Sequence, residues 1–299
     1  MFFIKKFISS LLTIFMVSVI SFTILQVIPG DPALSKLGVN ASSEQISEFR
    51  KSLNLDRPVY IKYGEWAKNV VVGNMGESIR FSSPVNQLIG KRAKVTFLLA
   101  GYVMLISIIV GVPLGVASSI IKNKFIQRVI FIASGIGISI PSFWCGLLLM
   151  LMVSHTIGGS LITGTLLLPI ITLAIPRISM LIIYIKNMVE EEMKMDYVKA
   201  SIIRGKSKVS IVVGDVLRNI ALPLVTIISG FFIKVLVGSV VIESLFNISG
   251  LGNLLILAVE NRDYPIVQGL ILYSSIIVVF INFTTDLIYT YIDPRVKIK

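Results

Sequence analysis

The chain has 299 residues, of which 55% are hydrophobic and only 15% charged, and its mean hydropathy of +0.87 excludes a soluble domain, in which about a quarter of the residues are charged. A single histidine, His155, and a single cysteine, Cys145, exclude a Cys/His metal cluster, a Cys–His catalytic pair and a disulfide framework. The formal net charge of +12 would suggest nucleic acid in a soluble protein, but in an integral membrane protein it is typical of basic loops at an anionic lipid surface, so we expect lipid contact and no nucleic-acid partner.

The N-terminal part, residues 1–30, is expected to contain the first transmembrane helix. The run Phe7–Ile28 carries no charged residue and follows Lys5 and Lys6. It is longer than the roughly 7–15 apolar residues of a signal-peptide core, and no small-x-small cleavage site follows it. Because about 20 apolar residues cross a bilayer, we expect this run to be a retained membrane helix.

Residues 31–94 are too polar to span a membrane and are expected to form an extracytoplasmic segment with two short helices. Ser42 and Gln45 have the spacing of a capping box. Apolar residues at helical spacing predict the first helix, namely Ile46, Phe49 and Leu53. After a predicted turn at Leu55–Pro58, aromatic residues typical of interfacial anchors mark the second helix, namely Tyr60, Tyr63 and Trp66.

Residues 95–299 are expected to form a transmembrane core with five further helices. The apolar runs that predict them are Val95–Ile121, Val129 to a turn at Ser154–Ser160, Leu161–Ile185, Leu222–Ile242 and Ile266–Tyr291. The sequence therefore predicts an all-α polytopic membrane protein with about six transmembrane helices. Gly111 and Gly115 have the spacing of a small-xxx-small motif, which fits a close contact within the chain and a subunit interface equally well.

The distribution of lysine and arginine predicts that both termini are cytoplasmic. Basic residues concentrate in four regions, which are Lys5–Lys6, Lys122–Arg128, Lys186–Arg218 and Arg295–Lys299. In the short loops of the opposite side, the Ser154–Ser160 turn has no basic residue and the loop between the last two helices has only Arg262, and positively charged loops stay in the cytoplasm. Lys91, Arg92 and Lys94 depart from this pattern, but they lie in a loop longer than about 60 residues, where the rule weakens.

No pattern in the chain predicts catalysis. Gly205-Lys206-Ser207 ends like a phosphate-binding loop, but Ala200 stands where such a loop needs glycine. Gly250 and Gly252 lack the third glycine of a dinucleotide fingerprint. We interpret Glu190–Glu192 as a solvated face. We therefore expect no catalytic residue, no metal site and no cofactor in this chain.

The most informative segment is the predicted cytoplasmic loop of about residues 186–220. Four of its residues share one face of a short helix, namely Tyr197, Ala200, Ile203 and Arg204. Gly205 is expected to end that helix. A transport protein without an ATP site of its own could receive force at such a helix from a separate ATPase.

This loop resembles the EAA loop of ABC importer permeases, and more narrowly the peptide/nickel branch of that family. The resemblance rests on Tyr197–Gly205 followed by Leu217–Pro223, with the longer gap between them that is typical of this branch. Lys199 stands where the general motif has glutamate, which fits the branch, and Ser201 stands where it has alanine. The implied ATPase-coupling residues are Tyr197, Lys199, Ala200, Ser201, Arg204 and Gly205.

Further matches to the first of the two permease subunits of this family run through nearly the whole chain. They are Val27–Ala33, Leu53–Pro58, Gly73–Ser78, Gly111–Gly115, Ile140–Trp144, Gly250–Gly252, Arg262–Gly269 and Asp293–Arg295. The chain departs from the family in a short loop between its third and fourth helices and in Lys234, where the family is apolar or glycine-rich. Because a lysine in mid-membrane is costly, we expect Lys234 to face the translocation pathway or a second permease, and the alternative is partial snorkelling of its side chain with no transport role.

The resemblance implies a type I ABC importer permease fold. The chain would form half of a translocation pathway for dipeptides or oligopeptides in the plasma membrane of a prokaryote. The implied partners are a second homologous permease subunit, two ATPase subunits that bind the ATP, and an extracytoplasmic substrate-binding protein. Nickel or a metal chelate is the alternative substrate. From other classes, the alternatives are a secondary transporter, which would show coupling ionisable residues and internal repeats, and a structural or enzymatic membrane protein.

Overall fold

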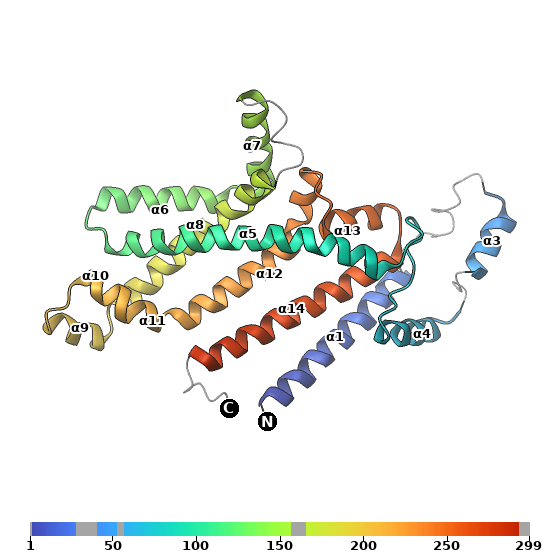
Figure 1. Cartoon of the computed structure of the whole chain (residues 1–299), viewed down its shortest axis with the longest axis horizontal. Helices are drawn as coiled ribbons and strands as arrows, with labels where there is room; N and C mark the ends of the chain where they lie inside the picture. Colours follow the sequence, from blue (N-terminus) through green and yellow to red (C-terminus); the bar gives the residue numbers. More distant parts are fainter. Residues whose placement is uncertain (1, 28–40, 53–56, 157–165, 293–299) are drawn as a thin grey trace. The chain divides into compact units, whose positions relative to one another are not determined.

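The computed structural model describes residues 2–27, 41–52, 57–156 and 166–292 (Figure 1). These residues form helices and no strand longer than a single bridge, so the predicted all-α class is confirmed for them. Four predicted stretches lie outside the described residues, namely 28–33, 53–56, 157–165, which includes the start of the predicted span Leu161–Ile185, and 293–295.

Five helices are long and apolar enough to cross a membrane, and they match five of the predicted spans. They are α1 (Phe2–Val27), α5 (Val85–Ile120), α8 (Leu167–Glu192), α12 (Ala221–Leu245) and α14 (Tyr264–Ile292). Helix α5 begins well before the predicted run Val95–Ile121, so its first turns carry the basic residues Lys91, Arg92 and Lys94. These turns are helical because Val85 and Ile89 are buried on one side of them.

The third predicted span is not one continuous helix. Helices α6 (Lys124–Ser139) and α7 (Ser142–Thr156) are bent by 101° and count as a sixth span only if taken together. Pro141 explains the break, because it has no N–H to donate and keeps Ile140 in an extended conformation at φ −81° and ψ 121°. The prediction of one helix from Val129 to the turn at Ser154 was wrong at this point.

The chain divides into two compact units. Of the described residues, the first unit contains those up to Thr96 and Ser249–Phe280, and the second contains those of Phe97–Ile248 and Ile281–Ile292. The long helices α5 and α14 each contribute one part to either unit. The first unit also holds the short helices α3 (Ser43–Ser52), α4 (Val59–Val71) and α13 (Leu251–Glu260), the last of which no sequence pattern had predicted.

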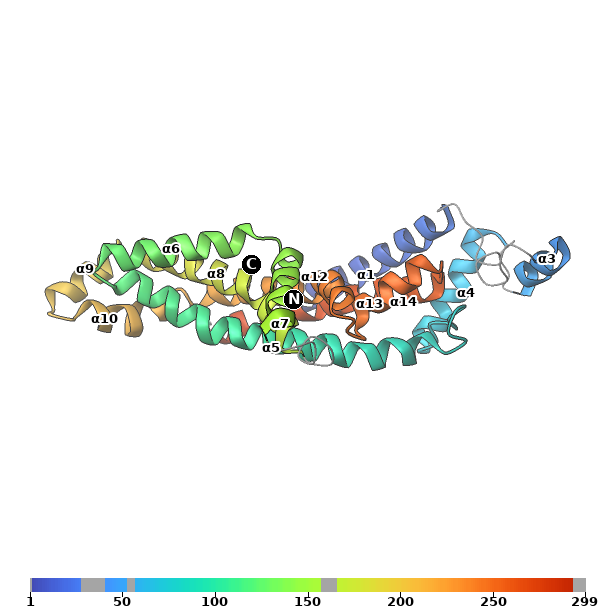
Figure 2. The ribbon, with the colours of Figure 1, turned by 90° about the horizontal axis from the view of Figure 1, so that it is seen from above.

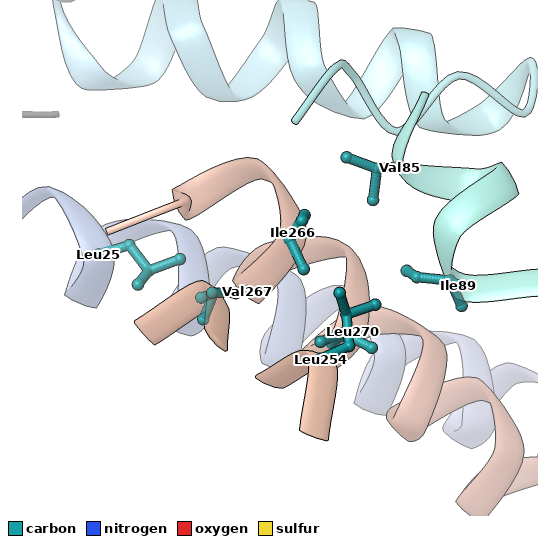
Figure 3. Close-up of a cluster of buried hydrophobic side chains, with 8 residues drawn as sticks. Leu25, Val85, Ile89, Leu254, Ile266, Val267 and Leu270 are labelled. Atoms are coloured by element: carbon teal, nitrogen blue, oxygen red, sulfur yellow. The ribbon is translucent and has the colours of Figure 1, made fainter. Parts of the chain in front are cut away.

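The core of the first unit joins the start of α5 to α13 and to the start of α14 (Figure 3). Its buried side chains are Leu25, Val85, Ile89, Leu254, Ala258, Ile266, Val267 and Leu270. Gly269 permits the close approach, because a Cβ atom there would lie 2.7 Å from Cγ1 of Val85. The start of α5 and the Arg262–Gly269 stretch, which are distant in the sequence, are therefore packed together in one unit.

Both predicted short helices of the polar N-terminal segment are present. The capping box forms as predicted: the Gln45 N–H donates to Ser42 Oγ at 3.2 Å, and the Ser42 N–H donates to Gln45 Oε1 at 3.0 Å. On α4, the rings of Tyr63 and Trp66 contact Phe22 of α1, with centroid separations of 5.5 and 5.7 Å. These two aromatic residues hold α4 against α1.

In the second unit, α8 is the central helix. It packs against α6, α7 and α12, and α6 runs beside it in both views (Figures 1 and 2). Helix α5 approaches α8 at Gly111 and Gly115, where a Cβ atom would lie 2.9 Å from Cβ of Leu181 and of Ile185 respectively. A close contact within the chain therefore accounts for the small-xxx-small motif.

After α8 the chain forms four short helices at one end of the second unit. They are α9 (Asp196–Ile203), α10 (Lys208–Ile211), the π-helix η2 (Val212–Val216) and α11 (Leu217–Asn219). Helix η2 contacts α8, α10 and α11, and α10 contacts α9. The buried apolar residues of these helices and of the end of α8 are Ile185, Val189, Val198, Ile211, Val212 and Val216. These contacts give the 186–220 segment a fixed base.

Candidate functional site

Helix α9 ends at the glycine that the sequence predicted. Gly205 has φ +81°, and its N–H donates to the carbonyl of Ile202 at 2.9 Å while the N–H of Lys206 donates to the carbonyl of Ser201 at 3.1 Å. These two bonds form a Schellman motif, whose left-handed residue is usually glycine. The predicted end of the helix is confirmed, and Gly205 turns the chain from α9 toward α10.

One side of α9 is buried and the other is exposed and partly apolar. Val198 and Ser201 are buried, and Tyr197 lies half-buried at the edge of this side. On the exposed side, Ile202 and Ile203 keep 54% and 86% of their surface. The helical face predicted from the sequence is therefore divided: Tyr197 points toward the base, whereas the exposed residues of that face are Ala200, Ile203 and Arg204.

The carboxylate of Glu192, at the end of α8, holds α9 and α11 together. The hydroxyl of Tyr197 donates to Glu192 Oε1 at 2.9 Å, and the side-chain amide of Asn219 donates to the same oxygen at 3.0 Å. Burial, and next the hydrogen bond to Glu192, raise the pKa of Tyr197 to about 12. Its hydroxyl is therefore a proton donor throughout the physiological pH range.

Two lysines attach the next part of the segment. Lys206 forms an ion pair with Asp215 of η2 at 2.8 Å. The ammonium of Lys208 donates to the carbonyl of Ser119 at 2.7 Å, in the last turn of α5. The last carbonyls of a helix have no partner within the helix, so this bond both caps α5 and fixes α10 to it.

The remaining predicted residues of the site interact locally. Lys199 pairs with Asp196 at 2.7 Å on the exposed side of α9, and Arg204 donates to the hydroxyl of Ser201 at 3.2 Å. Exposed ion pairs of this kind contribute little to stability. The structure thus brings Tyr197 and Ser201 into the base and leaves Lys199, Ala200 and Arg204 available on the surface.

Two residues that organise the site were not predicted from the sequence. Glu192 was interpreted as part of a solvated face, because a run of three glutamates gives no sign that one of them faces inward. Asp215 lies on a π-helix, which has no sequence signature of its own. Asn219, which donates to Glu192, lies in the Leu217–Pro223 stretch that resembles the family. That resemblance was the only sequence signal for this part of the site.

Lys234 is exposed at mid-length on α12, away from the 186–220 segment. A lysine in mid-membrane costs about 2.5–3.5 kcal/mol on insertion scales unless it reaches water or a partner. The guanidinium of Arg177 on α8 lies against the same helix, with Nη2 3.8 Å from the position of a Cβ atom at Gly238. Among the described residues, no group of three or more His, Cys, Asp or Glu side chains is arranged to hold a metal ion.

Two family comparisons cover nearly the whole chain. Residues 111–298 match the family described as binding-protein-dependent transport system inner membrane component. Residues 1–90 match the N-terminal region of binding-protein-dependent transport system membrane components.

The similar proteins include permeases of two named specificities. A protein of Brucella abortus named as a putative peptide transport system permease is 33% identical over 307 residues, which cover 98% of each chain. The nickel import system permease protein NikB of Staphylococcus aureus is 29% identical, over 98% of this chain and 91% of that protein.

A solved structure supports the fold. An inward-facing conformation of the MetNI methionine ABC transporter has a chain that matches with a TM-score of 0.60 and 19% identity, over 69% of this chain and 97% of that one. The type I ABC importer permease fold is therefore confirmed. The chain belongs to the family of inner membrane components of binding-protein-dependent transport systems, the multi-pass permease subunits of bacterial ABC importers, which are transport components and not catalysts.

Proposed function

We propose that this permease forms half of a translocation pathway for dipeptides or oligopeptides and that ATPase subunits drive it through α9. The observation that carries the coupling role is the contrast between the two sides of α9. Ile203 is 86% exposed, whereas the other side is fixed to α8 through Tyr197 and Glu192. An exposed apolar helix end on a fixed base suits docking of a partner protein.

The attachments of the 186–220 segment give force a route into the membrane helices. Glu192 belongs to the last turn of α8, and Lys208 binds the last turn of α5. A partner that moved α9 would therefore move the ends of α5 and α8 with it. In this proposal ATP is bound by two ATPase subunits, this chain holds no cofactor, and closure of the ATPases changes access to the pathway by rigid-body motion.

The proposal also includes the other partners and the topology. A second homologous permease would supply the other half of the pathway, and an extracytoplasmic binding protein would deliver the substrate. Both termini and the 186–220 segment would lie in the cytoplasm, because basic residues concentrate there. Residues 31–94 would lie outside.

Peptides are the proposed substrate because several relatives that match nearly the full chain are named for peptide transport. Nickel or a metal chelate is the second candidate, which the similarity to the nickel import permease favours. Among the described residues the chain has no metal-ligand cluster that would mark it for nickel, and metal recognition could reside in the binding protein.

Reconstitution tests the proposed function. The chain would be co-expressed and co-purified with candidate second permease, ATPase and binding-protein subunits and placed in liposomes with ATP inside or outside. We expect ATP-dependent and binding-protein-dependent uptake of a labelled tripeptide. Uptake of nickel but not of any peptide would favour the second candidate, and uptake driven by an ion gradient without ATP would contradict the proposal.

A further inference from the structure

Two cationic side chains lie at similar depth on adjoining membrane helices of the second unit. At 1.5 Å per residue and measured from the helix ends away from the 186–220 segment, Lys234 is about 17 Å along α12 from Leu245, and Arg177 is about 15 Å along α8 from Leu167. Helices α8 and α12 pack against each other. Both charges are therefore far from either end of their helices.

The backbone of α12 brings the two charges to one stripe. Gly238 follows Lys234 by one helical turn, and the Arg177 guanidinium lies against Gly238. Gly230 precedes Lys234 by one turn, so the positions four residues before and four residues after the lysine on α12 are both glycine. Lys234 itself is exposed, and Gly238 beside Arg177 is also exposed.

Neither cation is neutralised within the part of the chain that the structure describes. The described ion pairs join other residues, and Arg177 and Lys234 form no hydrogen bond to a carboxylate there. Glu243, the buried carboxylate of α12, accepts from Ser239 at 3.0 Å, more than two turns beyond Lys234. Two neighbouring cations without an anion create a positive potential that would attract one.

We infer that Arg177 and Lys234 form a site for the carboxylate of a passing substrate, such as the C-terminal carboxylate of a peptide. This inference rests on the proposed function for the nature of the substrate, but not for the site itself. Arginine can present two parallel N–H groups to a carboxylate, and lysine adds a mobile charge beside it. The site would lower the barrier for a carboxylate at mid-membrane without holding it tightly.

Cysteine reactivity tests the site without any transported substrate. Lys234→Cys would be placed in a Cys145→Ala background of the reconstituted complex and treated with an anionic sulfonatoethyl and a cationic trimethylammonioethyl methanethiosulfonate. We expect the cysteine at position 234 to react with both reagents. The ratio of its reaction rate with the anionic reagent to that with the cationic reagent should be higher than the same ratio for a Lys124→Cys reference. Arg177→Met should lower this preference about tenfold, and Arg177→Lys should keep it. An unreactive cysteine, or a preference that Arg177→Met leaves unchanged, would overturn the inference.

Transport then tests what the site recognises. Uptake of a tripeptide with a free carboxylate would be compared with uptake of its C-terminal amide, at saturating binding protein, in the wild type and in Lys234→Met and Lys234→Arg. We expect Lys234→Met to slow the free acid about tenfold more than the amide, and Lys234→Arg to keep the wild-type ratio. Equal slowing of both peptides would refute carboxylate recognition. If the wild type takes up no peptide, but the cysteine at position 234 shows the expected charge preference, the result would count against the proposed peptide substrate alone.

Discussion

The hydroxyl of Ser78 donates a hydrogen bond of 2.6 Å to the carboxylate of Asp263, although 185 positions separate the two residues. Both side chains are buried, and the same carboxylate oxygen accepts from the backbone N–H of Arg80 at 3.0 Å. The bond joins the polar loop before α5 to the turn between α13 and α14. It fixes this loop, which is proposed to lie outside the membrane, within the first unit.

Asp263→Ala is expected to destabilise the purified chain by about 1–3 kcal/mol, because it leaves buried donors without an acceptor. The measurement is thermal unfolding in detergent, and the signal that reports unfolding is the exposure of the buried side chains of the first unit. Glu48→Gln on the exposed face of α3 is the matched control and should unfold like the wild type. Equal stability of Asp263→Ala and Glu48→Gln would show that the carboxylate does not hold this loop.

Gly205→Ala tests the end of α9. Gly205 has φ +81°, and no neighbouring atom lies within 4 Å of the position that an alanine Cβ would take, so the expected cost is one of backbone conformation alone, about 1–2 kcal/mol. Gly64→Ala on α4 also has open space but lies within an ordinary helix, and there alanine should be neutral or stabilising by up to about 1 kcal/mol. Thermal unfolding in detergent should separate the two variants, and similar midpoints would contradict the left-handed turn at Gly205.

Tyr197→Phe removes one of the two donors to Glu192 and should cost about 1 kcal/mol at neutral pH. The raised pKa of about 12 favours the neutral hydroxyl in the folded chain, so the stabilisation is complete below the ordinary pKa of 10.0 and is lost as the pH rises from there through about 12. The difference between the ultraviolet tyrosinate titrations of wild type and variant should show one group near pH 12. If the tyrosine that the variant lacks instead titrates near pH 10 in the wild type, the bond to Glu192 would be disproved.

Much of this fold could be predicted from the sequence because its signals are local. Charge-free runs mark the membrane helices, Ser42 and Gln45 mark a capping box, and Gly205 marks the end of α9. The bend between α6 and α7 was missed, since a proline in an apolar run is compatible with a kinked helix as well as with a break, and the choice depends on packing against α8.

The candidate site was predicted as a segment but not as a set of contacts. The motif located α9, yet helical spacing could not say which side of α9 would be buried, because Val198 and Ser201 on one side are balanced by Ala200 and Ile203 on the other. The role of Glu192 depends on tertiary contacts with Tyr197 and Asn219. A single sequence carries no local signal for tertiary contacts of this kind.

The proposed topology predicts which residues an impermeant reagent can reach. In a Cys145→Ala background, Glu48→Cys should react with an impermeant maleimide in sealed cells, because residues 31–94 are proposed to lie outside. Lys124→Cys and Lys206→Cys should react only after permeabilisation. Labelling at position 206 in sealed cells would show that the orientation is the reverse of the proposed one and that the 186–220 segment does not lie on the cytoplasmic side, where an ATPase could bind it.

Ala200→Glu tests the central claim, that ATPase subunits drive this permease through the exposed side of α9. The measurement is uptake per ATP hydrolysed by the reconstituted complex, with Ala200→Ser as the matched control at the same exposed position. We predict that Ala200→Glu leaves the folded chain intact and ATP hydrolysis continuing while uptake falls to background, and that Ala200→Ser behaves like the wild type. Normal uptake per ATP in Ala200→Glu, at normal amounts of assembled complex, would contradict the claim.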